Sequence, residues 1–343
     1  MRTRIRTARK MTEFRALAFE DIFSYLTEPC DTLILFHRNP DADAVGSAFA
    51  LKAVLSDLGS RAWCVCCDEL PDRLRFLADS EQTSVLPSAI PEELDIQRII
   101  SVDCASPTQL GSLYELYGDR INLMIDHHGM GEVYADHYVD PKVAATGEIM
   151  FDLVKALATE GHVTITDALC TDLYAAISGD TGCFKYSNVT SDTHLRAAEL
   201  VASGIDCAEI NHCLFEAKSL DQLRAESAGI SNLNLFADGK VAVITFPYAL
   251  KAALGLSDEH LGTLVDVARS LTGVQIAIAI RQPSTDGSFR ASMRSSCSYD
   301  VAALCAKFGG GGHKKAAGCT IVAADIDEAM KKIVTEIYFD ALN

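Results

Sequence analysis

Short runs of apolar and β-branched residues alternate with helix-length segments between residues 32 and 125. The runs are TLILFH, RAWCVCC, RIISVDC and NLMIDHH. Parallel strands need crossover connections of this length, and strands that alternate with helices are typical of sheets covered on both faces. The pattern therefore predicts an α/β domain with a parallel sheet and helices on both faces. The polar stretch between the second and third runs is expected to be one of these helices.

Polar side chains follow three of these runs at the point where each expected strand ends. His37 comes after LILF, Asp103 after ISV, and Asp126 with His127 after LMI. In an open parallel sheet, ligands bind outside the carboxyl ends of the strands. We therefore expect these side chains to converge on a functional site.

Apolar spacing predicts a helix over residues 44–58, with Asp43 as its N-cap and Gly59 just past its end. Further helical stretches are predicted over 146–157 and 165–178, and the second of these runs into Gly179-Asp180-Thr181-Gly182. Residues 191–226 have the composition of polar helices and are expected to bridge two domains.

The pattern changes beyond residue 236. VAVITF predicts a strand, and QIAIAIRQ and FRASMRSS, joined by the turn residues PSTDGS, predict a hairpin. A short helix over 301–308 then leads into four glycines, a last strand and a last helix. The 343 residues are too many for one compact core and too few for three. We expect a domain over 1–215, a linker over 216–235, and a smaller mixed-sheet domain over 236–343.

Composition narrows the class of protein. No apolar run approaches the roughly 18 residues that cross a bilayer. The first ten residues are basic and lack the apolar core of a secretory signal, so they form a solvated tail or the chain starts at Met11. The 12 cysteines are scattered through apolar segments without zinc-type spacing, which predicts reduced thiols in a cytoplasmic protein.

The formal net charge of −17 argues against binding of long nucleic acid over the whole surface, because phosphate neutralisation dominates such binding. A local basic stretch lies between residues 281 and 315. It is either an ordinary solvated face or the patch that meets an anionic substrate. Its cations are Arg281, Arg290, Arg294, Lys307, Lys314 and Lys315.

Each acidic or histidine residue near the expected strand ends has a structural interpretation when taken singly, such as a turn at Asp41 or a buried hydrogen bond at His37. Together they crowd one sheet edge with negative charge, which is unfavourable unless cations bind. Carboxylates combined with imidazoles suit Mn²⁺ better than Mg²⁺, and the cluster lacks the cysteines of a structural zinc site. Two cations sharing a carboxylate favour hydrolysis at phosphorus.

Five motifs resemble, in order, those of the DHH phosphoesterases that carry a DHHA1 domain. They are the string HRNPDADAVGS from His37 to Ser47; Asp103; the triplet Asp126-His127-His128; Gly179-Asp180-Thr181-Gly182; and Arg294-Ser295-Ser296 followed by GGGGHK at 309–314. The resemblance covers nearly the whole chain. It extends to the two-domain branch of bifunctional nano-RNases and phosphatases of 3′-phosphoadenosine 5′-phosphate (pAp).

The resemblance implies two metal sites with shared ligands. One would be formed by His37, Asp41, Asp103 and Asp180, and the other by Asp43, Asp103, His127 and Asp180. The implied cofactors are two Mn²⁺ ions, with Mg²⁺ or Co²⁺ as substitutes.

The resemblance also implies the residues that act on the substrate. Asp103 would take part in catalysis, and His128 would hold a phosphate oxygen or assist the leaving group. Asp126 would orient the imidazoles. The other phosphate of the nucleotide would bind in a cleft between the domains, at Arg294, Gly310, Gly311, Gly312 and His313.

The implied activity is manganese-dependent release of mononucleotides from very short RNA or DNA oligomers, together with dephosphorylation of pAp. The partners would be these small substrates, with no long nucleic acid and no membrane, and a homodimer is left open. Hydrolysis of pApA or a cyclic dinucleotide is the alternative within the same class, followed by polyphosphate hydrolysis. A non-catalytic nucleotide sensor is the alternative from another class.

Overall fold

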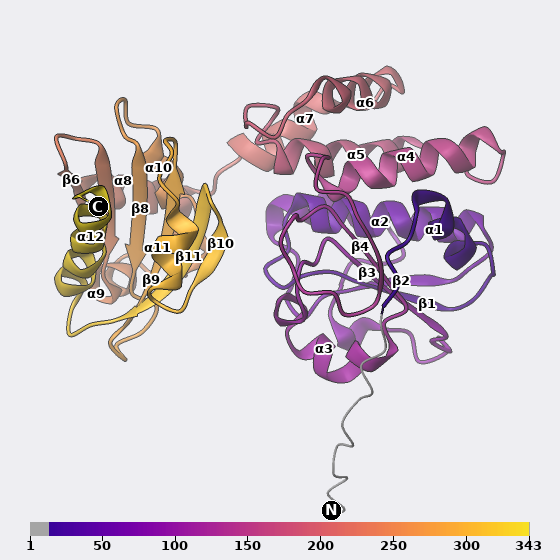
Figure 1. The fold of residues 1–343 in the computed structure, drawn as a ribbon, viewed down its shortest axis with the longest axis horizontal. Helices are drawn as coiled ribbons and strands as arrows, with labels where there is room; N and C mark the ends of the chain where they lie inside the picture. The colour runs from indigo at the N-terminus through magenta and orange to yellow at the C-terminus, as the bar shows by residue number, and fades with distance from the viewer. Residues whose placement is uncertain (1–13, 343) are drawn as a thin grey trace, which may run out of the picture. The chain divides into compact units, whose positions relative to one another are not determined.

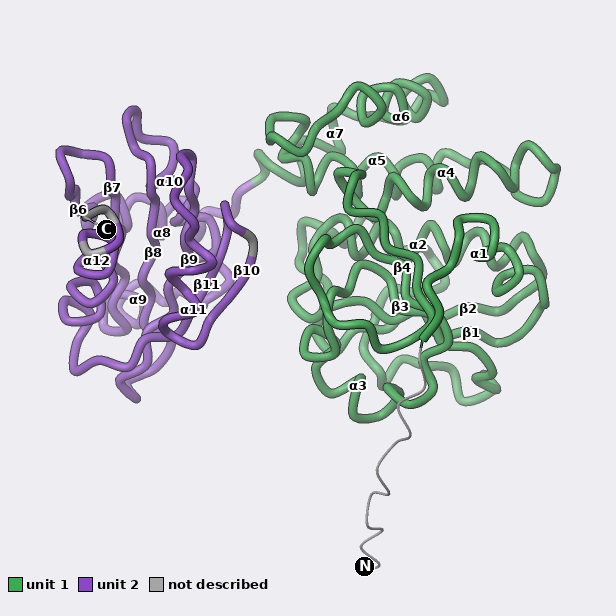
Figure 2. Tube along the Cα trace, viewed as in Figure 1, with its two compact units in different colours: residues 1–217 green, residues 218–343 purple. Residues whose placement is uncertain are grey.

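The structure is a computed structural model that describes residues 14–342, apart from the side chains of His313, Phe339, Ala341 and Leu342. The basic residues 1–10 and the alternative start Met11 lie outside the described residues. The chain divides into two compact units, residues 1–217 and residues 218–343 (Figure 2).

Unit 1 contains a five-stranded parallel sheet, which we call sheet A. Its strand order is β2-β1-β3-β4-β5, and every neighbouring pair is parallel. The predicted α/β fold with a parallel sheet is confirmed. The strands are β1 Thr32–Leu35, β2 Ala62–Val65, β3 Arg98–Val102, β4 Leu123–Asp126 and β5 Asp136–Val139.

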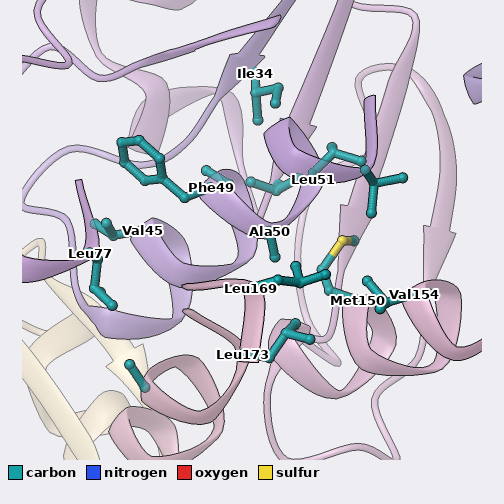
Figure 3. Close-up of a cluster of buried hydrophobic side chains, with 14 of the residues drawn as sticks. Ile34, Val45, Phe49, Ala50, Leu51, Leu77, Met150, Val154, Leu169 and Leu173 are labelled. Atoms are coloured by element: carbon teal, nitrogen blue, oxygen red, sulfur yellow. The ribbon is translucent and has the colours of Figure 1, made fainter. Parts of the chain in front are cut away.

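Helices cover both faces of sheet A, as predicted (Figure 1). On one face α1 (Phe19–Leu26) and α2 (Ala42–Asp57) pack on the strands, and α4 (Thr146–Thr159) and α5 (Asp167–Asp180) pack on α2. Figure 3 shows side chains of α2, α4 and α5 meeting in this core, including Leu51, Met150 and Leu173. The opposite face is covered by α3 (Ser112–Tyr117), while α6 (Ser191–Ala202) and α7 (Cys207–Asn211) pack against α5.

The stretch between β2 and β3 differs from the helix predicted there. It forms two short 3₁₀ turns, Asp72–Leu77 and Pro87–Ala89, joined by irregular chain. Pro71, Pro87 and Pro91 explain the difference, because proline lacks the N–H group that an α-helix interior needs.

The start of α2 also differs from prediction. The N-cap is Asp41, whose Oδ1 accepts a hydrogen bond from the Ala44 N–H at 3.0 Å. Asp43, predicted as the cap, lies in the first turn and is fully buried. The spacing of apolar residues indicated the helix but not the cap, because the small Ala42 adds no signal to that pattern.

Glycines allow α2, α4 and α5 to approach closely. A Cβ atom at Gly46 of α2 would collide with the backbone carbonyl of Asp172 on α5. A Cβ atom at Gly147 of α4 would collide with Ala176 of α5. This close packing places the N-termini of α2 and α4 beside the C-terminus of α5.

Unit 2 contains a six-stranded mixed sheet, sheet B, in the order β10-β11-β9-β8-β7-β6. Only the β7 and β8 pair is parallel within this sheet, and the predicted hairpin is present as β8 and β9. The mixed sheet confirms the prediction. The strands are β6 Leu233–Phe236, β7 Val241–Phe246, β8 Ile276–Arg281, β9 Ser288–Ser295, β10 Gly311–His313 and β11 Ala316–Val322.

Sheet B separates two hydrophobic clusters. One cluster lies under α11 (Val301–Ala306) and α12 (Ile326–Leu342), and the other involves α8 (Leu220–Ser231), α9 (Tyr248–Ala253) and α10 (Leu264–Arg269). The helix α8 falls within residues 216–235, which the sequence suggested as a linker. Ala225 of α8 is completely buried, so this segment is part of unit 2. The largely polar composition of α8 concealed that packing.

Within residues 14–342, no helix is both long and apolar enough to cross a membrane.

Asp172 of α5 gives a test of this packing. The residue is 8% exposed, and burial together with the charge of Asp79 holds its pKa well above the usual range of an aspartate. The folded state therefore binds a proton that the unfolded state releases above about pH 4. We expect the free energy of unfolding of Asp172→Asn, relative to wild type, to rise as pH increases from about 4 towards neutrality. Urea titrations at several pH values measure this difference.

The exposed Asp167 at the start of the same helix provides the control. Comparing Asp167→Asn with Asp172→Asn separates the effect of burial from the simple loss of a carboxylate. If the difference in free energy of unfolding between wild type and Asp172→Asn does not change with pH, the prediction is wrong.

Candidate metal centre

Residues from several connections converge near the carboxyl ends of β1, β3 and β4. His37 lies two residues beyond β1, Asp103 directly follows β3, and His127 directly follows β4. The start of α2 supplies Asp41 and Asp43. Asp180, the last residue of α5, completes the set. The structure thus brings together all six side chains that the sequence suggested as metal ligands.

The first donor group consists of His37, Asp41 and Asp103. His37 Nε2 lies 3.6 Å from Asp41 Oδ1 and 3.5 Å from Asp103 Oδ2. The other ring nitrogen, Nδ1, is 2.9 Å from the Arg38 carbonyl oxygen, to which it can donate. This contact fixes the ring with Nε2 towards the carboxylates, the arrangement that metal-binding histidines usually adopt.

The second donor group consists of Asp43, His127 and Asp180. His127 Nε2 lies 3.2 Å from Asp180 Oδ2 and 3.9 Å from Asp43 Oδ2. None of these contacts is aligned as a hydrogen bond, and Nε2 is buried without a hydrogen-bond partner. A buried nitrogen surrounded by carboxylates is a suitable ligand for a cation.

Asp103 lies between the two groups. Its Oδ2 faces His37, while its Oδ1 lies 3.7 Å from His127 Nε2. The residue has a positive φ of 52°, which aspartate tolerates better than most side chains, and it is only 2% exposed. One carboxylate therefore presents an oxygen to each group. Asp180 is placed with the second group only.

The N-terminus of α4 holds Asp43, a contact that the sequence did not reveal. The backbone N–H groups of Thr146 and Gly147 donate to the two carboxylate oxygens of Asp43 at 2.7 and 2.8 Å. Ser47 also donates to Asp43 at 3.1 Å, and Thr146 Oγ1 donates to Asp103 at 2.9 Å. The sequence placed a helix start at Thr146, but not its position beside Asp43.

The protonation equilibria show how unfavourable this crowding is for the protein alone. Burial and the nearby charge of Asp103 hold the pKa of Asp43 well above its usual range, and burial raises the pKa of Asp180 to about 6. Burial alone would lower the pKa of His127, but the surrounding carboxylates raise it to about 11. The raised pKa values favour bound protons, which reduce the net negative charge of the site. Divalent cations would neutralise that charge instead.

The donor atoms suit cations that accept oxygen and nitrogen ligands. The nearest thiols do not contribute, because Cys66 Sγ donates to the His37 carbonyl and Cys104 Sγ to the Ser106 carbonyl. Burial also raises the pKa of both thiols to about 12, so neither is a thiolate at neutral pH. Carboxylates with imidazoles and no thiolate match Mn²⁺ or Mg²⁺ better than structural zinc.

Asp126 and His128 lie beside the donor groups. The Nδ1–H of His128 donates to Asp126 Oδ1 at 2.7 Å, and the backbone N–H of His127 donates to the same oxygen at 2.8 Å. Asp126 is 1% exposed; it orients the ring of His128 and holds the backbone of His127. His128 also lies close enough to Asp103 and His127 to join a donor group, although its Nδ1 is engaged by Asp126.

The remaining predicted residues belong to unit 2. Arg294 on β9 is directly opposite Ala316 on β11, and β10, which contains Gly311 and Gly312, pairs with the other edge of β11. Arg294 is half-buried, and its Nη1 donates to the Met293 carbonyl. The predicted His313 has a side chain outside the described residues.

Two of the glycines have a structural cause within unit 2. A Cβ atom at Gly310 would collide with the Gly318 carbonyl, and one at Gly312 would collide with the Ala316 carbonyl. Gly312 also has a φ of 138°, which L-residues rarely adopt. Gly311, like Gly309, has open space where a Cβ would lie, so another molecule can approach its backbone.

Asp103 provides the test of the two-group arrangement. We expect Asp103→Ala to fold and to lose binding at both groups, because each loses an oxygen ligand and the remaining ligands lose their common neighbour. Equilibrium dialysis against Mn²⁺, followed by metal analysis, measures the occupancy. Asp140→Ala is the matched control, since Asp140 follows β5 as Asp103 follows β3 but belongs to neither group. Full occupancy in the Asp103 variant would remove it from the centre.

Two known proteins are similar to this chain over most of its length. The protein is 29% identical over 306 residues to the bifunctional oligoribonuclease and PAP phosphatase NrnA of Thermus thermophilus, covering 89% of this chain and 88% of the relative. It is 24% identical to the cyclic-di-AMP phosphodiesterase PdeA of Listeria monocytogenes, covering 96% of this chain but 50% of the relative.

A solved structure shares the fold. The crystal structure of an exopolyphosphatase-related protein from Bacteroides fragilis aligns with a TM-score of 0.83 at 22% identity, covering 95% of this chain and 97% of that one.

The model of the DHH family, N-terminal domain, matches residues 31–177, and that of the DHHA1 domain matches residues 238–338. The chain belongs to the DHH family of metal-dependent phosphoesterases and carries a C-terminal DHHA1 domain.

Proposed function

We propose that the protein is a manganese-dependent phosphoesterase that releases mononucleotides from very short oligonucleotides and dephosphorylates pAp. The observation that carries the proposal is Asp103, whose two carboxylate oxygens face two separate donor groups. A carboxylate shared in this way suits a pair of cations acting on one phosphoryl group. Similarity to an oligoribonuclease and PAP phosphatase over most of both chains supports the choice of substrate.

Two Mn²⁺ ions at these groups would neutralise the phosphoryl oxygens and activate water for attack at phosphorus. His37, Asp41 and Asp103 would hold one, and Asp43, His127, Asp180 and Asp103 the other, with Asp180 proposed as a second shared ligand. Mg²⁺ or Co²⁺ would be substitutes. The oxygen and nitrogen donors and the disengaged thiols support this choice.

The residues of unit 1 would act on the substrate through orientation and charge. Asp126 holds the ring of His128, so His128 would donate to a phosphate oxygen or to the leaving group. The N-terminus of α4 holds Asp43 by two N–H groups, which keeps the second donor group in place without a further side chain.

Unit 2 would bind the phosphate that does not react. Arg294 supplies a guanidinium group, and Gly311 leaves its backbone open to a ligand. The proposed site also includes the residues on either side of Gly311, which are Gly310, Gly312 and His313. A net charge of −17 supports a small substrate over a long one, since long nucleic acid needs extensive phosphate neutralisation.

We place the activity in the cytoplasm, which the 12 free cysteines support because disulfides are rare there. The homodimer stays a prediction. The alternative of pApA or cyclic-dinucleotide hydrolysis is weaker, because this chain corresponds to half of the cyclic-di-AMP phosphodiesterase, whereas it matches the oligoribonuclease relative over 88% of its length.

A substrate panel with Mn²⁺ tests the proposal. The panel contains pAp, pApA, cyclic di-AMP, oligonucleotides of two to five residues, a long RNA and polyphosphate. We expect the highest kcat/KM values on pAp and the shortest oligonucleotides, with mononucleotide products. A maximum on a cyclic dinucleotide or on polyphosphate would replace the proposal by that activity. Tight binding of pAp without any turnover would indicate a sensor.

His128 is expected to affect rate and not metal binding. His128→Ala should keep both metal ions and lose about 10²–10³ in kcat, the usual effect of removing one donor to developing charge. Stopped-time assays on pAp, with metal analysis of the same sample, separate the two effects. If the folded variant turns over at the wild-type rate and only its melting temperature falls, His128 has a purely structural role.

Arg294 is expected to affect binding of the remote phosphate. Arg294→Ala should raise KM for pAp and for dinucleotides far more than it changes hydrolysis of an activated phosphodiester that lacks a second phosphate, because the lost contact is distant from the reacting atom. Steady-state kinetics on both substrates measure the difference. Equal losses on the two substrates would exclude this role for Arg294.

A further inference from the structure

Two arginines lie directly opposite each other on neighbouring strands of unit 2. Arg281 ends β8 and pairs in register with Arg290 on β9. Side chains of directly opposed residues on antiparallel strands are close neighbours, and like charges at such positions are destabilising. This arginine pair, Arg281 and Arg290, has no part in the groups described above.

No carboxylate compensates the arginine pair within residues 14–342, since neither guanidinium forms an ion pair there. Asp258, the carboxylate that acts on Arg281 electrostatically, is engaged by Lys251 Nζ instead. Arg281 Nη1 donates only to the backbone carbonyl of Asp258, at 3.3 Å. Lys251 and Arg281 therefore share one carboxylate, while the charge of Arg290 acts on Arg281 from the opposite strand.

Arg281 carries the stronger evidence of an unmet interaction. Its side chain is half-buried, and its Nε is buried without a hydrogen-bond partner. Burial and the opposed charge of Arg290 both lower the pKa of Arg281, which reflects a guanidinium in surroundings that disfavour its charge. A solvated surface arginine such as the exposed Arg290 needs no explanation, but a buried and unpaired donor does.

The face of sheet B that carries Arg290 is exposed along β9 and β11, whereas the neighbouring Ala279 of β8 is buried in the cluster that includes α8 and α10. Alternation along β9 places Arg290, Ser292 and Arg294 on one face, because successive side chains of a strand point to opposite sides. Their partners on β11 are Thr320, Gly318 and Ala316, all small. On β8, Ala279 pairs in register with Ser292, which lies midway between Arg290 and Arg294 on β9. Small side chains thus connect the arginine pair to Arg294.

The separation along this face is set by the strand itself. Arg290 and Arg294 are four residues apart on β9, which corresponds to about 13 Å along the strand. An extended oligonucleotide strand can span this distance, so the two positions can bind different phosphates of the same chain.

We propose that the arginine pair is a second phosphate subsite, which binds a phosphodiester of an oligonucleotide other than the reacting phosphate and the phosphate at Arg294. This inference rests on the proposed function. Guanidinium groups bind phosphate oxygens through paired, charge-assisted hydrogen bonds, and an anion between two opposed guanidinium groups offsets their repulsion. pAp and dinucleotides are too short to reach the subsite, and oligonucleotides of three or more residues engage it.

Arg290→Gln and Arg281→Gln test the subsite by their dependence on substrate length. Both variants should raise KM about tenfold for tri- and tetranucleotides, the loss expected for one charge-assisted contact, with kcat unchanged. KM for pAp and dinucleotides should stay at the wild-type value. Lys331→Gln is the matched control, since Lys331 is an exposed cation on α12, which packs against the opposite face of sheet B.

A binding measurement separates this inference from the proposed function. The affinity of a phosphorothioate trinucleotide for the full chain in EDTA should fall about tenfold in Arg290→Gln, even if no substrate is hydrolysed. Wild-type hydrolysis of all lengths combined with unchanged KM in both variants would overturn the subsite and leave the proposed function standing. Equal losses for pAp and the trinucleotide would also overturn it.

Two further measurements address a variant that does not fold and a free anion as the ligand of the arginine pair. If Arg281→Gln does not fold, Arg290→Gln still provides the answer, because Arg290 is exposed and its replacement leaves the packing intact. Inorganic phosphate is the probe for a free anion. Loss of phosphate binding in Arg290→Gln without any change for the trinucleotide would assign the arginine pair to a free anion and overturn the subsite.

Discussion

Negative charge concentrated at one edge of sheet A is the constraint on which the rest of unit 1 depends. The carboxylates of Asp43 and Asp103 are 0% and 2% exposed, with Asp41 and Asp180 next to them. Carboxylates in such surroundings repel one another strongly, because little solvent screens them. In the unfolded chain the same groups are separated and hydrated. Cation binding at this edge and folding of this edge are therefore thermodynamically linked.

Helix termini offset part of this charge before any cation binds. Asp41 caps α2, and the N–H groups at the start of α4 bind both oxygens of Asp43. The partial positive charge of a helix N-terminus stabilises an anion there. The cap hydrogen bond and the contact with His37 both involve Asp41 Oδ1. The structural interpretation of Asp41 as a local cap and its functional interpretation as a ligand are compatible, because an ionised carboxylate has about four acceptor positions and the cap occupies one of them. Glycines at Gly46 and Gly147 allow the helices to come close enough for this arrangement.

The sequence predicted features that depend on local pattern. Alternating apolar runs predicted sheet A, and the positions of His37, Asp103 and His127 after those runs predicted that they would meet. Local pattern could not identify the contact between Thr146 and Asp43, because these residues are 103 positions apart and the contact uses a backbone N–H that every residue possesses. The division of the ligands into two groups came from family resemblance and not from spacing.

Errors in the prediction have equally physical causes. The helix expected between β2 and β3 was inferred from polarity, which does not register the N–H groups that prolines remove. The expected linker contains α8, whose buried surface is small residues such as Ala225 and therefore produces a weak apolar pattern. Apolar periodicity detects large side chains in a core, and it fails where close packing depends on small ones.

The effect of the arginines of unit 2 on a polyanion depends on the net charge of the whole chain. Arg281, Arg290 and Arg294 share one face of sheet B in a protein with a net charge of −17. A few arginines on such a background neutralise a few phosphates, and each additional phosphate of a longer polyanion meets repulsion instead of a partner. On the proposed function, discrimination against long nucleic acid then requires no steric barrier. It follows from the small number of cations on this face and from the net negative charge of the chain as a whole.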